Sequence, residues 1–200
     1  VGVGGWPGPS VNFTGLKFTK MNGSILLDST ESVFMSDLCI DDGASMSNDF
    51  FNFIENGPLT LRRTILTLAN STNIMYYGSG RMGRYPHVTI EDLTLNFLEN
   101  NNKGLPASQT KRYFRFVFTL GADLISPRLT INNITFQNKS SSAQAFAQVF
   151  QIAKYPNVTL NGLNLRDQTF STSQNGVFQF SNIKTLTLQN CTLLNNQIES

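Results

Sequence analysis

The residue types that could carry chemistry in this chain are few. Asp41 and Asp42 form the only Asp–Asp doublet, and glycosidic cleavage needs two carboxylates about 5 to 9.5 Å apart. His87 is the sole histidine, which excludes a metal site built from several histidines and leaves any Ser–His triad resting on one residue. The sequence therefore predicts no catalytic residue, no metal site and no cofactor.

A second set of functional side chains lies in two long connections, Gly78 to His87 and Thr119 to Arg128. Both precede an apolar, strand-like stretch, so we expect them on the same side of the molecule. Together they would gather arginines, a tyrosine and the histidine, which could hold an anionic ligand or a sugar by charge-assisted hydrogen bonds and stacking. The alternative is a pair of solvated loops. The candidate ligand-binding residues are Arg81, Arg84, Tyr85, His87 and Arg128.

The composition is that of a folded chain with little charge. The 200 residues carry a formal net charge of +2, and 40% are hydrophobic while only 14% are charged. No run of Lys and Arg is present, so nucleic acid is not an expected partner. No apolar stretch reaches the roughly 20 residues that a membrane helix needs. Residues 1–200 are expected to form one domain, which the start without Met suggests is a segment of a longer chain or a filament subunit.

One eight-residue pattern recurs along nearly the whole chain. In this octet, positions one, three, six and eight are apolar, which is the alternation of strands with one buried face around a two-residue corner. Thr64, at position six of the third copy, is the one lapse. Repetition in register predicts units that stack on one another. The copies are "VNFTGLKF" from Val11, "VFMSDLCI" from Val33, "LTLRRTIL" from Leu59, "VTIEDLTL" from Val88, "LTINNITF" from Leu129, "VTLNGLNL" from Val158 and "LTLQNCTL" from Leu186.

Pairs of apolar residues precede six of the seven octets. Four pairs begin eight residues before the octet, and two lie five residues farther back. Each unit is therefore expected to contain three short strands, which pair in parallel with those of the next unit at about 4.8 Å. The pairs are Ile25/Leu27, Phe51/Phe53, Met75/Tyr77, Phe116/Phe118, Phe150/Ile152 and Phe178/Phe180.

These patterns resemble the parallel β-helix proteins of the pectin-lyase-like superfamily, whose "VTI-x-x-LTF" repeat is matched by "VTIEDLTL" and "LTINNITF". The resemblance covers about residues 11–195 and implies an all-β, single-stranded parallel β-helix, right-handed in its common form, of about seven three-strand rungs. A polar insertion would occupy about residues 97–114. A β-sandwich is the competing architecture, but a sandwich has no reason to repeat one octet in register.

The resemblance leaves function open, because the superfamily includes polysaccharide lyases, glycoside hydrolases, phage tailspikes, adhesins and surface proteins. The hydrolase signatures Gly-His-Gly and Arg-Ile-Lys are absent from this chain. Its octets also lack the file of Asp residues that would hold Ca²⁺ in a lyase. Thr and Asn fill the outward positions instead, which favours a scaffold over an enzyme.

The corner of the octet, at positions four and five, carries charged residues in the earlier copies. Arg62 would lie beside Glu91, and Arg63 between Asp37 and Asp92. This order predicts ion pairs between neighbouring rungs, each worth about 0–1 kcal/mol, and the alternative is a charged binding strip. In the later copies the corner holds asparagines, which suit tight turns.

The expected compartment follows from seven Asn-x-Ser/Thr sequons, against the roughly four that composition would give by chance. All lie at outward strand positions, corners or connections, where a glycan would fit. The amides of Asn133 and Asn190 are expected to turn inward at their corners, which would lower their occupancy. The alternative is a cytosolic, Asn-rich protein with chance sequons. The candidate N-glycosylation sites are Asn12, Asn22, Asn70, Asn133, Asn138, Asn157 and Asn190.

The two cysteines are expected to stay unpaired. Cys39 would point outward on the second rung and Cys191 inward on the seventh, about 24 Å away. A disulfide requires Cβ atoms about 4 Å apart. Cys191 is therefore expected to be a small core residue, and no disulfide is predicted.

The sequence as a whole predicts a non-catalytic structural or adhesive protein, N-glycosylated and located outside the cell or at its surface. Its expected partners are glycans, polysaccharide, and further rungs or other copies of itself, because neither end shows a capping helix or charged plug. The first alternative is a polysaccharide lyase or glycoside hydrolase of the same superfamily. The second is a viral or phage fibre.

Overall fold

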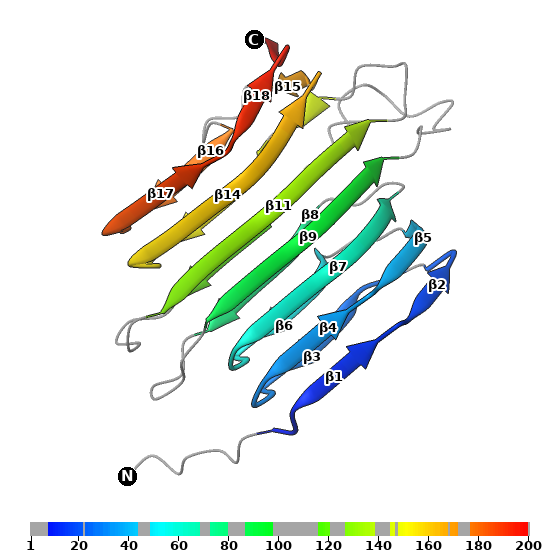
Figure 1. Ribbon diagram of the computed structural model, residues 1–200. Coiled ribbons are helices and arrows are strands. Elements are labelled where there is room, and N and C mark those ends of the chain that lie inside the picture. The colour runs from blue at the N-terminus through cyan, green and yellow to red at the C-terminus, as the bar shows by residue number, and fades with distance from the viewer. Residues whose placement is uncertain are drawn as a thin grey trace.

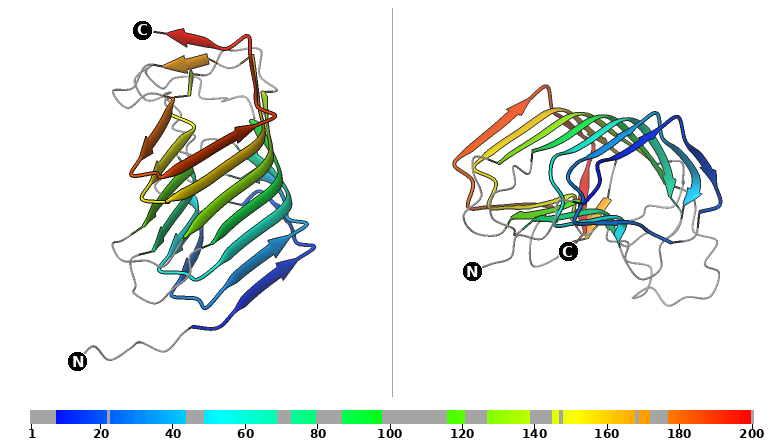
Figure 2. Two further views of the ribbon diagram at one scale, coloured as in Figure 1. Left: turned by 60° about the vertical axis from the view of Figure 1, so that its left-hand side comes forward. Right: turned by 90° about the horizontal axis from the view of Figure 1, so that it is seen from below.

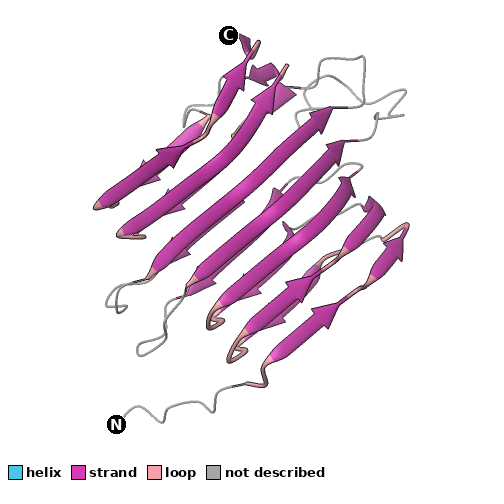
Figure 3. Ribbon diagram, viewed as in Figure 1, coloured by secondary structure: helices cyan, strands magenta, loops and turns pink. Residues whose placement is uncertain are grey.

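The structure is a computed structural model that describes residues 8–21, 23–43, 49–68, 73–79, 87–97, 116–120, 127–138, 145–146, 148–167, 169–171 and 177–199. All secondary structure in these ranges is β-strand, and the strands pair in parallel (Figures 1 and 3). The prediction of an all-β chain with parallel strands is therefore confirmed. Apart from Phe97, the insertion expected at 97–114 lies outside the described residues.

The octets form the largest of three sheets. Consecutive octets are hydrogen-bonded neighbours, and their first residues align across the sheet: Val11 with Val33, Val33 with Leu59, and so on to Leu186. The register predicted from the repeat is confirmed. The main path runs through β1 (Val11–Thr14), β4 (Val33–Ser36), β7 (Leu59–Leu68), β9 (Val88–Phe97), β11 (Arg128–Asn138), β14 (Asn157–Arg166) and β17 (Thr185–Gln189), and β2 (Lys17–Thr19), β5 (Cys39–Gly43) and β18 (Thr192–Leu194) lie beyond the corners.

The apolar pairs that precede the octets form the six-stranded sheet. Phe51 aligns with Met75, Met75 with Phe116, and Phe116 with Phe150, so the two pairs set farther back keep the same register. The strands are β3 (Ile25–Asp28), β6 (Asp49–Ile54), β8 (Asn73–Ser79), β10 (Phe116–Leu120), β13 (Phe150–Ala153) and β16 (Phe178–Ser181). A third sheet contains β12 (Ala145–Phe146), β15 (Thr169–Ser171) and β19 (Gln197–Glu199).

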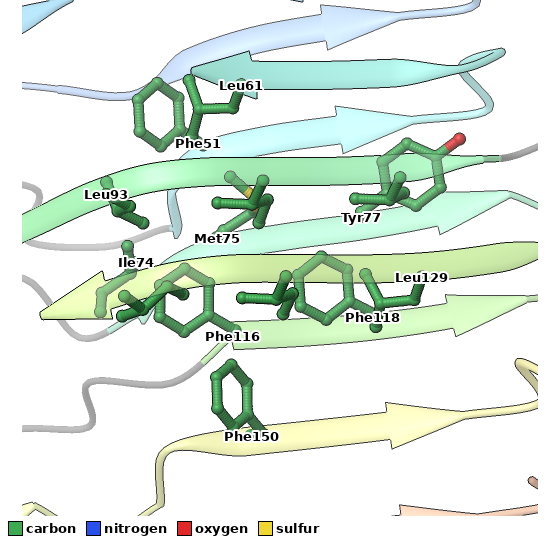
Figure 4. Close-up of a cluster of buried hydrophobic side chains, with 14 of the residues drawn as sticks. Phe51, Leu61, Ile74, Met75, Tyr77, Leu93, Phe116, Phe118, Leu129 and Phe150 are labelled. Carbon is green, nitrogen blue, oxygen red and sulfur yellow. The ribbon is translucent and has the colours of Figure 1, made fainter. Parts of the chain in front are cut away.

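The two larger sheets face each other across one elongated core. Figure 2 shows the octet sheet arched over the six-stranded sheet, an arrangement compatible with a β-helix-like fold. Aromatic rings from the six-stranded sheet line up along this core (Figure 4), with Phe116 and Phe150 5.4 Å apart between ring centroids. Thr64 is also fully buried, and its hydroxyl donates to the carbonyl of Arg62 at 3.2 Å. That local hydrogen bond explains how a polar residue replaces an apolar one in the octet.

A left-handed residue forms the octet corner in every copy. Position five has a positive φ, between 45° and 71°, in all seven octets. Such a conformation is nearly free for Gly and least costly for Asn and Asp among the other residues, which accounts for six of the seven residues. Arg63 is the exception. The seven residues are Gly15, Asp37, Arg63, Asp92, Asn133, Gly162 and Asn190.

A buried polar corner joins β6 to β7. The side chain of Asn56 is fully buried, and its Oδ1 accepts hydrogen bonds from the backbone N–H and the hydroxyl of Thr30. Its Nδ2 donates to the carbonyl of Leu27 at 2.9 Å. At the adjacent Gly57, a Cβ atom would lie only 1.8 Å from the backbone oxygen of Glu31. This Asn56–Gly57 corner thus lies in close contact with the segment from Leu27 to Glu31, which precedes the second octet.

Two buried tyrosines should respond differently to loss of their hydroxyls. Tyr77 donates to the carbonyls of Asn56 and Gly57, at 3.0 and 2.7 Å, whereas the buried Tyr155 hydroxyl has no hydrogen-bond partner among the described residues. Burial, and secondarily Tyr77, raises the pKa of Tyr155. We expect Tyr77→Phe to lower the free energy of unfolding by about 1–3 kcal/mol, because it leaves buried carbonyls unpaired. Tyr155→Phe should be neutral or stabilising in urea denaturation, and the reverse order would contradict this.

Candidate functional site

The candidate ligand-binding residues are only partly described. Arg81, Arg84 and Tyr85 lie outside the described residues. His87 directly precedes β9 and Arg128 begins β11, and because Val88 aligns with Leu129 these two residues lie at the same ends of two adjacent strands. Arg128 is exposed, while His87 is half-buried and its Nδ1 has no hydrogen-bond partner within the described part of the chain.

Polar side chains form a continuous strip along the octet corners. We define this corner strip by positions four and five from the second octet onward. Its shortest contact is a bidentate ion pair, in which Arg63 Nε and Nη2 donate to the two carboxylate oxygens of Asp37 at 2.6 and 2.7 Å. The hydroxyl of Ser36 donates to the same carboxylate at 3.0 Å. The hydrogen bonds from Arg63, and next that from Ser36, hold the pKa of Asp37 at about 2, below its ordinary value of 3.8.

The strip continues with a second ion pair. Arg62 Nε lies 2.7 Å from Glu91 Oε2, although that nitrogen has no aligned hydrogen bond in the described residues. Arg62 and Glu91 occupy aligned positions on β7 and β9. The prediction that neighbouring octets would be joined by corner ion pairs is confirmed.

In the later octets, asparagine side-chain amides replace the charged groups at the corner. Asn133 Nδ2 donates to Asp92 at 2.8 Å, Asn161 Nδ2 to Asn132 at 3.4 Å, and Asn190 Nδ2 to Asn161 at 2.9 Å. Asn133 and Asn190 are exposed, so the prediction that their amides turn inward is wrong. Their left-handed corner conformation leaves the side chains outside the core, where they bond along the strip instead.

Of the Asp41–Asp42 doublet, the structure describes the side chain of Asp41 but not that of Asp42. Asp41 Oδ2 lies 3.3 Å from Lys17 Nζ, and Cys39 Sγ is 3.8 Å from its Oδ1. Lys17 and Asp41 lie on the paired strands β2 and β5, so this contact also joins neighbouring octets. The described residues contain no group of three or more His, Cys, Asp and Glu side chains placed to hold a metal ion.

The sequons differ in how their asparagines are used. Asn12 and Asn157 are exposed on strands, and Asn12 Oδ1 accepts a hydrogen bond from Thr14. Asn138 ends β11, but its side chain is outside the description, as are Asn22 and Asn70 altogether. At Asn133 and Asn190, the nitrogen that would carry a glycan donates a hydrogen bond to the corner strip.

Both cysteines are free in the structure, Cys39 half-buried and Cys191 exposed. The expectation that Cys191 is a core residue is wrong. Among the described strands, β17 and β18 have a neighbour on one side only. Position six of this last octet therefore lacks the covering strand that buries the same position in earlier octets.

The ion pair at Asp37 should make stability sensitive to acid. Because its folded pKa is depressed, Asp37 contributes stability that is fully present above its unfolded pKa near 3.8 and is lost as the pH falls through about 2. We expect the stability difference between the unaltered protein and Asp37→Asn, measured by urea denaturation, to shrink from pH 6 to pH 2. Arg63→Gln should remove the same acid dependence, and a difference that grows on acidification would contradict the assignment.

Comparison with known proteins provides no relative. No protein-family model, no curated protein and no solved structure matches this chain. In the described part of the chain, no helix is long and apolar enough to span a membrane.

Proposed function

We propose that this chain is a structural or adhesive protein, built as a single-stranded parallel β-helix of about seven three-strand rungs in the manner of the pectin-lyase-like superfamily. The order of strands supports the coil, because the chain passes alternately between the six-stranded sheet and the octet sheet: β3 leads to β4, β6 to β7, and β8 to β9. With each passage, the chain moves on to the next strand of the six-stranded sheet and the next strand of the octet sheet. A coil of this kind is a stiff rod with a continuous core.

The observation that carries the proposed function is that the carboxylates of the corner strip have partners in neighbouring octets. Asp37 is paired with Arg63, Glu91 with Arg62, and Asp92 accepts from an amide. A hydrolytic or cation-binding strip needs carboxylates free to reach substrate or metal. These carboxylates instead join one octet to the next, which is the work of a scaffold.

The proposed location is the cell surface or the extracellular space, with N-glycans as covalent partners and polysaccharide as a further partner. Exposed sequon asparagines at Asn12 and Asn157 support it, because a glycan needs an outward amide with room around it. Asn133 and Asn190 are proposed as less occupied sites, since glycosylation would remove a hydrogen-bond donor from the corner strip.

The test is the intact mass of the native protein before and after enzymatic deglycosylation, together with surface labelling by a reagent that does not cross membranes. Loss of glycan mass and efficient labelling are expected. An unglycosylated protein that is labelled only after lysis would overturn the proposed location. The enzymatic alternative is tested with pectic and other acidic polysaccharides, with and without Ca²⁺, and turnover that Asp41→Ala abolishes would overturn the structural role.

A further inference from the structure

The backbone of this chain can react with its own side chains at Asn-Gly dipeptides. There the backbone nitrogen of the glycine attacks the side-chain carbonyl carbon, Cγ, of the asparagine. A bond forms between that nitrogen and Cγ, and the bond from Cγ to Nδ2 breaks, so that the amide leaves with the glycine proton as ammonia. Water then opens the succinimide ring to aspartate or isoaspartate. Glycine favours ring closure because it has no Cβ to hinder the attacking nitrogen.

Two of the four Asn-Gly dipeptides in the sequence have both residues in the described part of the chain. Asn56–Gly57 lies in the buried corner between β6 and β7, and Asn161–Gly162 forms the octet corner within β14. The side chain of Asn56 is fully buried, whereas Asn161 and Gly162 are half-buried. The same reactive pair of residues therefore occurs in two different environments within one molecule.

The groups that would react at Asn56–Gly57 all have hydrogen-bond partners in the folded protein. The attacking group, the N–H of Gly57, donates to the carbonyl of Thr30 at 3.0 Å. The leaving group, Nδ2 of Asn56, donates to the carbonyl of Leu27 at 2.9 Å. The side-chain oxygen of Asn56 accepts hydrogen bonds from the N–H and the hydroxyl of Thr30. The attacking nitrogen and the amide must both leave these partners before the ring can close.

The peptide unit between Asn56 and Gly57 is also restrained. Ring closure has to rotate this unit, so that the glycine nitrogen approaches Cγ and the Asn56 carbonyl changes direction. The hydroxyl of Tyr77, a residue of the core (Figure 4), donates to that carbonyl at 3.0 Å and to the Gly57 carbonyl at 2.7 Å. Water, which completes the reaction, is excluded from the fully buried side chain of Asn56. The reaction therefore requires the corner to open.

The amide of Asn161 is held more weakly. Its Nδ2 donates to Asn132 at the longer distance of 3.4 Å, and its Oδ1 accepts from Asn190 at 2.9 Å. Both partners are side chains of the corner strip, and side chains at the surface change rotamer far faster than a buried segment opens. Water also reaches this half-buried corner. We therefore expect Asn161 to react faster than Asn56 in the folded protein.

Reaction at Asn56 would prevent the corner from forming again. Aspartate at this position keeps an acceptor for Thr30 but presents a second oxygen, in place of a donor, to the carbonyl of Leu27. Such a buried carboxylate is costly because it loses its hydration and faces a carbonyl oxygen. Isoaspartate lengthens the backbone by one carbon beside Gly57, where even a Cβ atom would collide with the backbone oxygen of Glu31. Both products therefore favour the open corner.

We propose that Asn56–Gly57 is a deamidation site that the fold protects: it is modified only when the corner opens, and the modified chain cannot close the corner again. The site would thus record each lasting opening of the corner and make it irreversible. The reaction consumes water and releases ammonia, so it needs no enzyme or other reagent. The inference rests on the contacts of the corner and is independent of the proposed structural function.

Peptide mapping in isotopically labelled water tests the protection. The chain is incubated at neutral pH with and without denaturing urea, and is then digested in ordinary water so that only reaction during the incubation adds label. In urea, Asn56 and Asn161 should incorporate label at similar rates. In the folded protein, Asn56 should react at least about tenfold more slowly than in urea, because its reaction depends on the population of the open corner. Equal rates at the two dipeptides in the folded protein would overturn the proposal.

A pair of tyrosine variants tests whether the corner contacts provide the protection. Tyr77→Phe removes the hydroxyl that holds the two corner carbonyls, and should raise the rate at Asn56 in the folded protein about fivefold or more. Tyr155→Phe is the matched control, since the buried Tyr155 hydroxyl has no hydrogen-bond partner among the described residues. It should leave the rate at Asn56 unchanged. Circular dichroism shows that each variant is folded, and an unchanged rate in Tyr77→Phe would contradict the proposed protection.

Aspartate variants test whether the modification is irreversible for the fold. Asn56→Asp supplies one product of the reaction in uniform form, and Asn161→Asp supplies the same product at the half-buried corner. Asn56→Asp should lower the urea midpoint far more than Asn161→Asp, which should refold like the unaltered protein. Complete failure of Asn56→Asp to fold, with Asn161→Asp folded, has the same meaning. An Asn56→Asp chain that refolds with an unchanged midpoint would overturn the irreversible step.

Discussion

Replacing Asn56 with alanine is expected to lower the free energy of unfolding by about 3–5 kcal/mol, because the change removes several buried hydrogen bonds at once. The N–H and hydroxyl of Thr30 lose their common acceptor, and the carbonyl of Leu27 loses its donor. A methyl group offers none of them a replacement, and water is excluded from the fully buried site. Urea denaturation followed by circular dichroism measures the loss.

The matched control for this prediction is Asn157→Ala in unglycosylated protein. Asn157 is exposed, so its loss should change the free energy of unfolding by no more than about 0.5 kcal/mol. Equal effects at Asn56 and Asn157 would show that the Asn56–Gly57 corner does not hold these two segments of the chain together. A large effect at Asn56 alone would identify the corner as one of the main polar contacts between the segments that precede the second and third octets.

Strand register was predictable because the apolar positions of the octet determine which face of each strand is buried. A slip of one residue would move every apolar side chain of a strand to the solvent face, and seven copies exclude such slips independently. The apolar pairs before the octets were predictable for the same reason. Phe116 aligns with Met75 and Phe150 although its connection to the octet is longer, because alignment depends on which face is buried and not on loop length.

The corners were predictable in their position but not in the direction of their side chains. Gly, Asn and Asp at position five indicate a left-handed turn, and even Arg63 adopts it because the copies on either side do. Whether an amide then points inward depends on the partners available along the strip. Asn190 finds an acceptor on Asn161 outside the core, and nothing in one octet alone reveals that contact.

The Asn56–Gly57 corner was missed because it lies outside the repeated octet. Its only sequence signal is the dipeptide Asn-Gly, which is ordinary in any turn. The hydrogen bonds that make this corner important come from residues 20 or more positions away, Thr30 and Tyr77. Cys191 was misplaced for a related reason, since burial of a strand residue depends on the next strand, and β17 has none among the described residues.

The second large effect is expected from Phe116→Ala, which should cost about 3–5 kcal/mol of the free energy of unfolding. Phe116 is fully buried between Met75 and Phe150 in the six-stranded sheet, and its ring centroid lies 6.3 Å from that of Phe118. The hydrogen bonds between the strands of both larger sheets hold the backbone around the core in place. The cavity left by the ring therefore cannot collapse, and the full cost of lost contacts should appear in urea denaturation.

Phe178→Ala provides the control within the same row of rings. Phe178 aligns with Phe150, its ring lies 6.1 Å from that of Phe150, but it is only half-buried at the outer strand β16. Its removal should cost about 1–2 kcal/mol, since a smaller apolar area returns to water and no closed cavity forms. Equal losses at both positions would mean that β16 is covered in solution, and comparison at two protein concentrations would then show whether a second copy covers it: a loss at Phe178 that grows with concentration identifies the cover as intermolecular.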